Sequence, residues 1–195
     1  MISAQEVKKL RERTGASMIQ CKNALEESQG DIEKAIVIMQ KSGSKIADKK
    51  CGRNTSEGYI GSYIHSNGKV GVLVEIACET DFVAKNEEFR ELAHDLAMHV
   101  AANNPKYIDY KEINLEEIDG KKKELEEDVK KENKPANIAE KIVEGKVKKY
   151  FDEICFVNQM FVKNPDITVE QLLTQKIAKL GENINISKFT RFEIG

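Results

Sequence analysis

The sequence predicts an α+β fold in which a small helical module precedes a mixed core. Helix-start signals occur at Ser3, Ser17 and Asp31, and Asn67-Gly68 marks a tight turn between two strand-like apolar runs. An amphipathic helical pattern follows the second run. The 195 residues are 40% hydrophobic and 33% charged, which is typical of a helix-rich globular protein with a sizeable core.

The first 42 residues carry the signals of a three-helix bundle. Ser3-Ala4-Gln5-Glu6 and Ser17-Met18-Ile19-Gln20 match the capping box, in which two side chains satisfy backbone amides at a helix start. The second helix is expected to end at Gly30, and Asp31 can cap a third. We therefore predict a module at 1–42, close to the size at which a core becomes marginal.

The turn between the first two helices allows two interpretations. Arg11, Met18 and Ile19 gather at this end of the bundle. Met18 and Ile19 either fill the small core, as adaptable apolar side chains often do, or lie on the surface and bind a partner. The residue types alone leave both interpretations open.

A linker is expected at 43–57, where the sequence is polar and has no apolar period. Such a segment would tether the module and raise its effective concentration near a partner held by the main domain, residues 58–195.

The main domain begins with a predicted antiparallel hairpin around a two-residue turn at Asn67-Gly68. Alternation places one face in the core and leaves the other, with Ile60, Ile64 and Leu73, half apolar and open to cover by another sheet or subunit. His65, at the hairpin end, is either a polar cap or a partner contact. The residues expected on the core face are Tyr59, Tyr63, His65, Val70, Val72, Val74 and Ile76.

The stretch Glu79–Asn86 is expected to be a loop held at both ends, between the apolar strand Val70–Cys78 and a helix capped by Asn86. Phe82 is poorly placed for a core at the lip of a buried strand. Exposed apolar side chains on scaffolded loops are commoner at binding sites than elsewhere. We therefore predict that this stretch contacts a partner.

The remaining elements are predicted to be mostly helical. A buried stripe is expected on the helix after Asn86, at Phe89, Leu92, Ala93, Leu96, Ala97 and Val100. Residues 111–149 are densely charged and predict a helical hairpin that breaks at Asn133-Lys134-Pro135. Residues 168–180 predict a further helix, and residues 182–194 a final strand or two short strands.

Several classes of function are disfavoured by the residues. The phosphate-loop, GxSxG and HExxH motifs do not occur, so we expect no covalent catalysis. A net charge of −2 argues against direct nucleic-acid binding, and the longest apolar runs are too short to cross a membrane. The four dispersed cysteines lack metal-ligand spacing, and His94 and His99 would lie on different faces of one helix, so we expect no metal or cofactor.

Several motifs, in fixed order along the chain, resemble the elongation factor Ts family, the nucleotide-exchange factors of the GTPase elongation factor Tu. The central one is Thr80-Asp81-Phe82-Val83-Ala84-Lys85-Asn86. The others are Leu10-Arg11-Glu12-Arg13-Thr14-Gly15-Ala16, Gly181-Glu182-Asn183-Ile184 and Arg191-Phe192-Glu193. Together they cover essentially the whole chain.

The resemblance implies a fold and a set of contacts. Residues 1–42 would be a ubiquitin-associated-like domain whose turn, through Arg11, Met18 and Ile19, docks on elongation factor Tu, although Ile19 stands where the family usually has methionine. Phe82 would be a wedge near the magnesium site of the GTPase, with Asp81 beside it, and Thr80 to Val83 would dislodge the magnesium ion. The resemblance also covers the projecting helical hairpin. Lys85 and Asn86 would support the loop.

The single copy of the hairpin, loop and helix unit resembles the short form of the family. A second copy from another protomer would give a homodimer; the alternative is a monomer that works with one unit. The rival function is a helical adaptor in which the central loop is merely a structural turn. No signal-peptide pattern opens the chain, which predicts a cytoplasmic protein, and the matrix of an organelle stays open.

Overall fold

The computed structural model describes residues 2–130 and 135–195, and it has the predicted mixture of helices and small antiparallel sheets. The chain divides into two units, each built from separate stretches of sequence. The first unit comprises Met1–Tyr59, Ile76–Arg90 and Gln171–Asn185. The second unit comprises Ile60–Glu75, Glu91–Glu170 and Ile186–Gly195. The predicted division into a module at 1–42 and a main domain at 58–195 stays a prediction.

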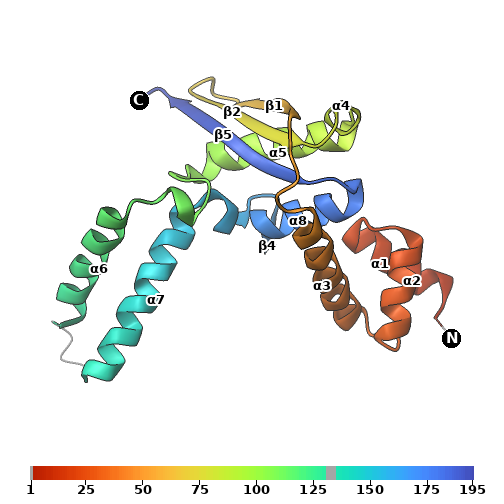
Figure 1. Cartoon of the computed structure of the whole chain (residues 1–195), viewed down its shortest axis with the longest axis horizontal. Helices are drawn as coiled ribbons and strands as arrows, with labels where there is room; N and C mark the ends of the chain where they lie inside the picture. The colour runs from red at the N-terminus through yellow and green to blue at the C-terminus, as the bar shows by residue number, and fades with distance from the viewer. Residues whose placement is uncertain (1, 131–134) are drawn as a thin grey trace. The chain divides into compact units, whose positions relative to one another are not determined.

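The three predicted N-terminal helices are present in the first unit: α1 (Ala4–Thr14), α2 (Met18–Glu27) and α3 (Ile32–Lys50) (Figure 1). Both capping boxes form at the starts of α1 and α2, and the Asp31 side chain caps α3 by accepting from the Lys34 N–H. The bundle encloses a small apolar core made of Val7, Leu10, Cys21, Ala24, Leu25 and Ala35.

The end of α2 differs from the prediction by three residues, because the helix stops at Glu27 rather than at Gly30. Gln29 and Gly30 have φ angles of 57° and 88°, values that an α-helix cannot use. Gly30 is therefore part of the connection to α3, where its positive φ favours glycine.

The expected linker at 43–57 requires a correction, because residues 43–50 are the last turns of α3. Gly43 is buried, and a Cβ added there would lie 3.7 Å from Thr174 and 3.8 Å from Ala178, both on α8 (Val169–Leu180). A small residue in a helix can mark close packing of two helices as well as a linker. The sequence pattern alone did not separate these two meanings.

The predicted hairpin consists of β1 (Glu57–Ile64) and β2 (Val70–Cys78). They form a three-stranded sheet with β5 (Ile184–Glu193) in the order β1-β2-β5. The prediction of a two-residue turn was wrong. The His65 N–H donates to the Val70 carbonyl, so the loop between the strands has four residues, 66–69. Within it Gly68 has a φ of 67°, while Asn67 accepts from the Lys69 N–H instead of adopting a positive φ.

The core face of the hairpin is confirmed at Val72, Val74 and Ile76, which are all buried. Tyr59 and His65 were expected on this face as well, but both are exposed because they lie near strand ends. The opposite face is exposed at its large apolar side chains, Ile60, Ile64 and Leu73.

The helix α5 (Glu87–Asn103) carries the predicted apolar stripe, and all six of its residues are buried. The strand β1 passes directly over this helix at Gly61, where an added Cβ would lie 2.4 Å from the Ala93 carbonyl oxygen. A residue with a side chain therefore cannot occupy position 61 without moving backbone.

The rest of the second unit includes a helical hairpin, α6 (Leu115–Lys130) and α7 (Ala136–Ile154), which run side by side in Figure 1. Of its predicted break, Asn133 and Lys134 lie outside the described residues. Short 3-10 helices occur at Tyr110–Glu112 (η1) and Phe156–Asn158 (η2). The antiparallel strands β3 (Met160–Phe161) and β4 (Asn164–Thr168) were not predicted.

Candidate functional site

The stretch after β2, expected to be a loop held at both ends, contains a single helical turn, α4 (Asp81–Ala84). Thr80 is its N-cap: the Thr80 Oγ1 accepts from the Val83 N–H at 3.4 Å. The Lys85 N–H donates to the Asp81 carbonyl and closes the turn at its other end. Asn86 then begins α5 through its side chain, which accepts from the Glu88 N–H at 2.8 Å.

The helical turn gives neighbouring residues opposite environments. Phe82 is 83% exposed, whereas Val83 is 7% exposed and Ala84 is also buried. Successive residues of an α-helix point about 100° apart, which explains why one apolar side chain projects while the next is buried. The partner contact predicted for Val83 stays a prediction, and in this structure its side chain is buried.

The acidic residue beside Phe82 is paired within the turn. The Lys85 Nζ donates to the Asp81 Oδ2 at 2.7 Å, and this hydrogen bond and charge lower the pKa of Asp81. Both side chains remain exposed. The surface that the turn presents is therefore an apolar ring, Phe82, beside an ion pair that can exchange partners at little cost.

Beneath the turn lies a polar cluster that sequence reasoning missed. The Glu182 carboxylate accepts from the Glu79 N–H at 3.1 Å, the Thr80 N–H at 3.0 Å and the Thr80 hydroxyl at 2.6 Å. Glu79 in turn accepts from the Asn183 N–H at 2.7 Å and pairs with Arg53 at 3.4 Å. The hydrogen bond from Asn183 lowers the pKa of Glu79.

The Cys78 thiol completes this support. It is buried and donates to the Thr80 carbonyl at 3.2 Å. Burial, together with the nearby charge of Glu182, raises the pKa of Cys78 to about 11, so the thiol stays protonated and can donate at neutral pH. Cys78 is a structural group and not a nucleophile, because only the thiolate reacts readily.

The residues predicted on the N-terminal module also lie on its surface. Met18 is 45% exposed and Ile19 is 73% exposed, so the interpretation that they fill the core is wrong. Arg11 is exposed on α1. Cys21 and Leu25, on the next turns of α2, fill the core in their place. The apolar residues at the start of α2 are therefore not part of the buried core of the bundle.

His65 belongs to the second unit and forms part of an exposed cluster there. Its Nδ1 lies 3.1 Å from the Tyr63 hydroxyl, and the two rings are 6.1 Å apart. The Tyr63 ring also makes an edge contact with His94, whose Nδ1 is 2.9 Å from the Ser62 carbonyl oxygen. The Tyr63 hydroxyl thus gives the His65 ring a hydrogen-bond partner at the end of its own strand, as expected for a polar cap.

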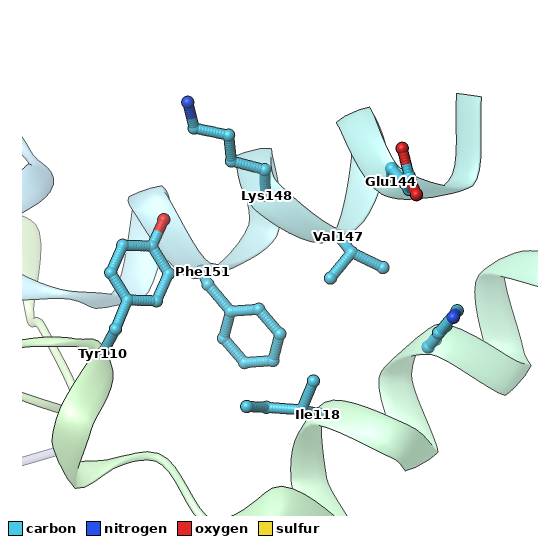
Figure 2. Close-up of a pocket in the computed structure, with 7 residues that line it drawn as sticks. Tyr110, Ile118, Glu144, Val147, Lys148 and Phe151 are labelled. Carbon is cyan, nitrogen blue, oxygen red and sulfur yellow. The ribbon is translucent and has the colours of Figure 1, made fainter. Parts of the chain in front are cut away.

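An open hollow of about 430 Å³ lies between α6 and α7. Figure 2 shows Phe151 and Val147 pointing from α7 toward Ile118 on α6. The Tyr110 hydroxyl at its edge donates to Asp152 at 2.5 Å, and burial and this bond raise the pKa of Tyr110. The hollow is lined by Tyr110, Ile118, Lys122, Glu144, Val147, Lys148 and Phe151.

Within residues 2–130 and 135–195, no group of three or more His, Cys, Asp or Glu side chains is placed to hold a metal ion. In the same part of the chain, no helix combines the length and apolar character that a bilayer-spanning segment needs. Of the predicted partner contacts, the exposed apolar side chains are Phe82 on α4 and Met18 and Ile19 at the start of α2.

The missed residues had one signal in the sequence. Gly181-Glu182-Asn183-Ile184 is one of the motifs that resemble the family, but its residue types alone do not indicate a role. Glu182 lies 103 residues from Glu79, and periodicity and capping patterns report only on neighbours a few residues apart. A pairing over such a distance appears only once the chain is folded.

Comparison with known proteins identifies relatives over the full chain. A family model described as elongation factor TS matches residues 3–195. A protein named elongation factor Ts from Carboxydothermus hydrogenoformans is 54% identical over 195 residues, which cover 100% of this chain and 90% of the relative. The corresponding protein of Acetivibrio thermocellus is 52% identical, covering 100% and 91% of the two chains. That of Caldanaerobacter subterraneus is 51% identical, covering 100% and 98%.

Proposed function

The chain belongs to the elongation factor Ts family, and we propose that it is a cytoplasmic guanine-nucleotide exchange factor that promotes GDP release from elongation factor Tu. Nucleotide exchange on elongation factor Tu is the general role of this family. The observation that carries the proposal for this chain is Phe82, an aromatic side chain that is 83% exposed on a short, tightly braced helical turn.

The proposed activity is differential binding rather than covalent catalysis. A GTPase holds its nucleotide through phosphate contacts and a magnesium ion, and an affinity in the nanomolar range corresponds to about 12 kcal/mol. A factor that binds the empty GTPase more tightly than the loaded one must, by linkage, weaken nucleotide binding by the same ratio. Excess GTP then displaces the factor and completes the cycle.

We propose that Phe82 inserts between elements of the GTPase near its magnesium site, with Asp81 beside it. A rigid aromatic anchor buries a large apolar area at a small cost in conformational entropy. The helical turn supports this role because α4 is capped by Thr80 and anchored by Val83 before any partner arrives. Within the predicted stretch Thr80 to Val83, Asp81 and Phe82 would touch the partner, and the other two residues would hold them in place.

A second proposed contact is the surface formed by Arg11, Met18 and Ile19 at the turn between α1 and α2. Its support is the exposure of both apolar side chains, which leaves them available to a partner. This contact would contribute to the affinity for elongation factor Tu, whereas the turn with Phe82 would displace the magnesium ion.

We also propose that the protein acts as a homodimer. The support is the exposed sheet face in the second unit, where Ile60, Ile64 and Leu73 lie open. A net charge of −2 offers little electrostatic opposition to self-association.

The deciding experiment is release of fluorescent GDP from elongation factor Tu with catalytic amounts of this protein, in limiting and then excess magnesium. We expect strong acceleration by the wild type. The Phe82→Ala variant should lose about thirtyfold or more of the catalysed rate, the equivalent of an interface hot spot of about 2 kcal/mol.

The matched control is Leu115→Ala, which removes another exposed apolar side chain from a helix outside the proposed site. It should leave the catalysed rate unchanged. A Phe82→Ala variant as active as the wild type would disprove the wedge. No acceleration by a folded wild type would instead favour an adaptor that binds helical partners through the N-terminal turn.

A further inference from the structure

The segment between α8 and β5 is hydrogen-bonded to the start of the turn that carries Phe82. Glu182 accepts three hydrogen bonds from Glu79 and Thr80, at 2.6 to 3.1 Å. The next residue, Asn183, donates its N–H to the Glu79 carboxylate at 2.7 Å and its amide group to the Arg53 carbonyl at 3.1 Å. All of these residues belong to the first unit.

The polar atoms of Thr80 are used up by these internal bonds. Its N–H and hydroxyl donate to Glu182, its hydroxyl oxygen also accepts from the Val83 N–H, and its carbonyl accepts from the Cys78 thiol and the Ala84 N–H. Thr80 is thereby fixed as the cap of α4 and sets the direction in which that turn begins.

A helix of one turn is unstable by itself, because nucleation fixes several residues for a single hydrogen bond. The turn Asp81–Ala84 therefore depends on what holds its ends. In the part of the chain that the structure describes, Glu182 is the charged acceptor that binds both Glu79 and Thr80. A carboxylate that accepts backbone N–H groups makes hydrogen bonds roughly twice as strong as neutral ones.

We infer that Glu182 is a positioning residue for nucleotide exchange: it preorganises the capped turn so that Phe82 projects in one orientation before elongation factor Tu is met. This inference rests on the proposed function. Without Glu182 the turn would have to be ordered during association, and the free energy needed for that ordering would be taken from the step that displaces the nucleotide.

The test compares Glu182→Ala, Glu182→Gln and, as a control, Glu27→Ala, which removes an exposed carboxylate from α2. GDP release is measured at saturating concentrations of each variant. We expect Glu182→Ala to lower the maximal rate about tenfold or more, since small errors in placement are costly. Glu182→Gln keeps the volume and an oxygen acceptor and should stay within about threefold of the wild type.

A double-mutant cycle separates positioning from general damage. If Glu182 acts through Phe82, then Glu182→Ala should change the rate of a Phe82→Ala protein by less than about twofold, because the side chain that it orients is already gone. If Glu182→Ala lowers the rate of GDP release equally in the wild type and in Phe82→Ala, the inference is overturned. A Glu182→Ala protein with the wild-type rate would also overturn it, and so would a Glu182→Gln protein as slow as Glu182→Ala.

A readout on the protein alone keeps the inference distinct from the proposed function. Amide hydrogen exchange at Thr80 and Val83 should become faster in Glu182→Ala, while the bundle amide of Leu25 keeps its protection. If the wild type fails to accelerate GDP release from elongation factor Tu, the proposed function fails, but this hydrogen-exchange measurement still tests whether Glu182 holds the turn. Unchanged protection of the Thr80 and Val83 amides in Glu182→Ala would overturn the inference about Glu182.

Discussion

Phe82 and Val83 show how a single residue step can separate an exposed side chain from a buried one. The two are adjacent apolar residues, yet one is exposed and the other is buried. The difference comes from α4, whose short turn rotates successive side chains away from each other. A sequence pattern too short to show a period cannot reveal this division, which explains why Val83 was assigned to the partner surface.

At the residue scale we predict that Ile19→Ala weakens binding to elongation factor Tu without reducing stability. Ile19 is exposed, and exposed substitutions usually change the free energy of unfolding by about 0.5 kcal/mol or less. Binding is measured by titration calorimetry and stability by urea denaturation. The contrasting variant is Leu25→Ala in the bundle core, which should cost about 2–5 kcal/mol. Unchanged affinity in Ile19→Ala would remove Ile19 from the contact.

A second residue-scale prediction concerns His99, which is buried between the rings of Phe156 and Phe161. Its Nδ1 accepts from the Val162 N–H at 3.1 Å, so its Nε2 carries the proton and donates to the Gln159 side chain at 2.8 Å. Burial lowers the pKa of His99 below its ordinary value of 6.5. The native state therefore holds a neutral imidazole.

Stability should consequently fall as the pH drops below 6.5, because the unfolded chain then binds a proton that the folded chain resists. Above that pH the contribution is fully present. Urea denaturation from pH 7.5 to 5 measures the slope, and His99→Gln should flatten it whatever its effect on absolute stability. His94→Gln, which replaces an exposed histidine, should not. Equal slopes in His99→Gln and the wild type would contradict this assignment.

At the scale of elements, two glycines within regular secondary structure have opposite roles. Gly61 in β1 lies against the backbone of Ala93 in α5, where an added Cβ would be 2.4 Å from the carbonyl oxygen. Gly145 lies within α7 and has open space around its Cβ position. The first is required by packing, and the second only weakens a helix.

We therefore predict that Gly61→Ala destabilises the protein by about 3 kcal/mol, since backbone has to move to accommodate the methyl group. Gly145→Ala should stabilise it by about 0.5–1 kcal/mol, because alanine favours a helix interior. Urea denaturation of both variants gives the comparison. Gly61→Ala with wild-type stability would mean that β1 does not approach α5 closely in solution.

The helical segments also show where composition misleads. Residues 43–50 look like a linker because they contain small and charged side chains, yet they continue α3 and pack on α8 through Gly43. Lys50 at the end of α3 donates to the Gly181 carbonyl at 2.6 Å. The α3 end is thereby bonded to the same segment that holds the Phe82 turn.

At the scale of the whole molecule, we predict that the protein is a dimer. Light scattering at micromolar concentration should give about twice the chain mass of 22.0 kDa. Leu73→Lys, on the exposed sheet face, should reduce the mass to that of one chain, since a buried unpaired charge opposes association. Leu115→Lys on α6 is the control and should remain a dimer. A wild type of about 22 kDa would favour a monomer that works with one copy of the core unit.

The sequence by itself determined the elements whose causes are local. Capping boxes place the starts of α1 and α2, the apolar stripe defines the buried side of α5, and the motif around Phe82 marks the candidate site. Such signals lie within a few residues of the structure that they specify, so a pattern can report them.

Only the tertiary structure decided which residues contact and support these elements from distant parts of the sequence. Glu182 reaches Thr80 across 102 residues, Gly43 meets α8, and Met18 and Ile19 are exposed because other residues fill the bundle core. The α4 turn likewise forms where a loop was expected. Hydrogen bonds and packing between distant segments depend on how the whole chain closes, and no local periodicity encodes that closure.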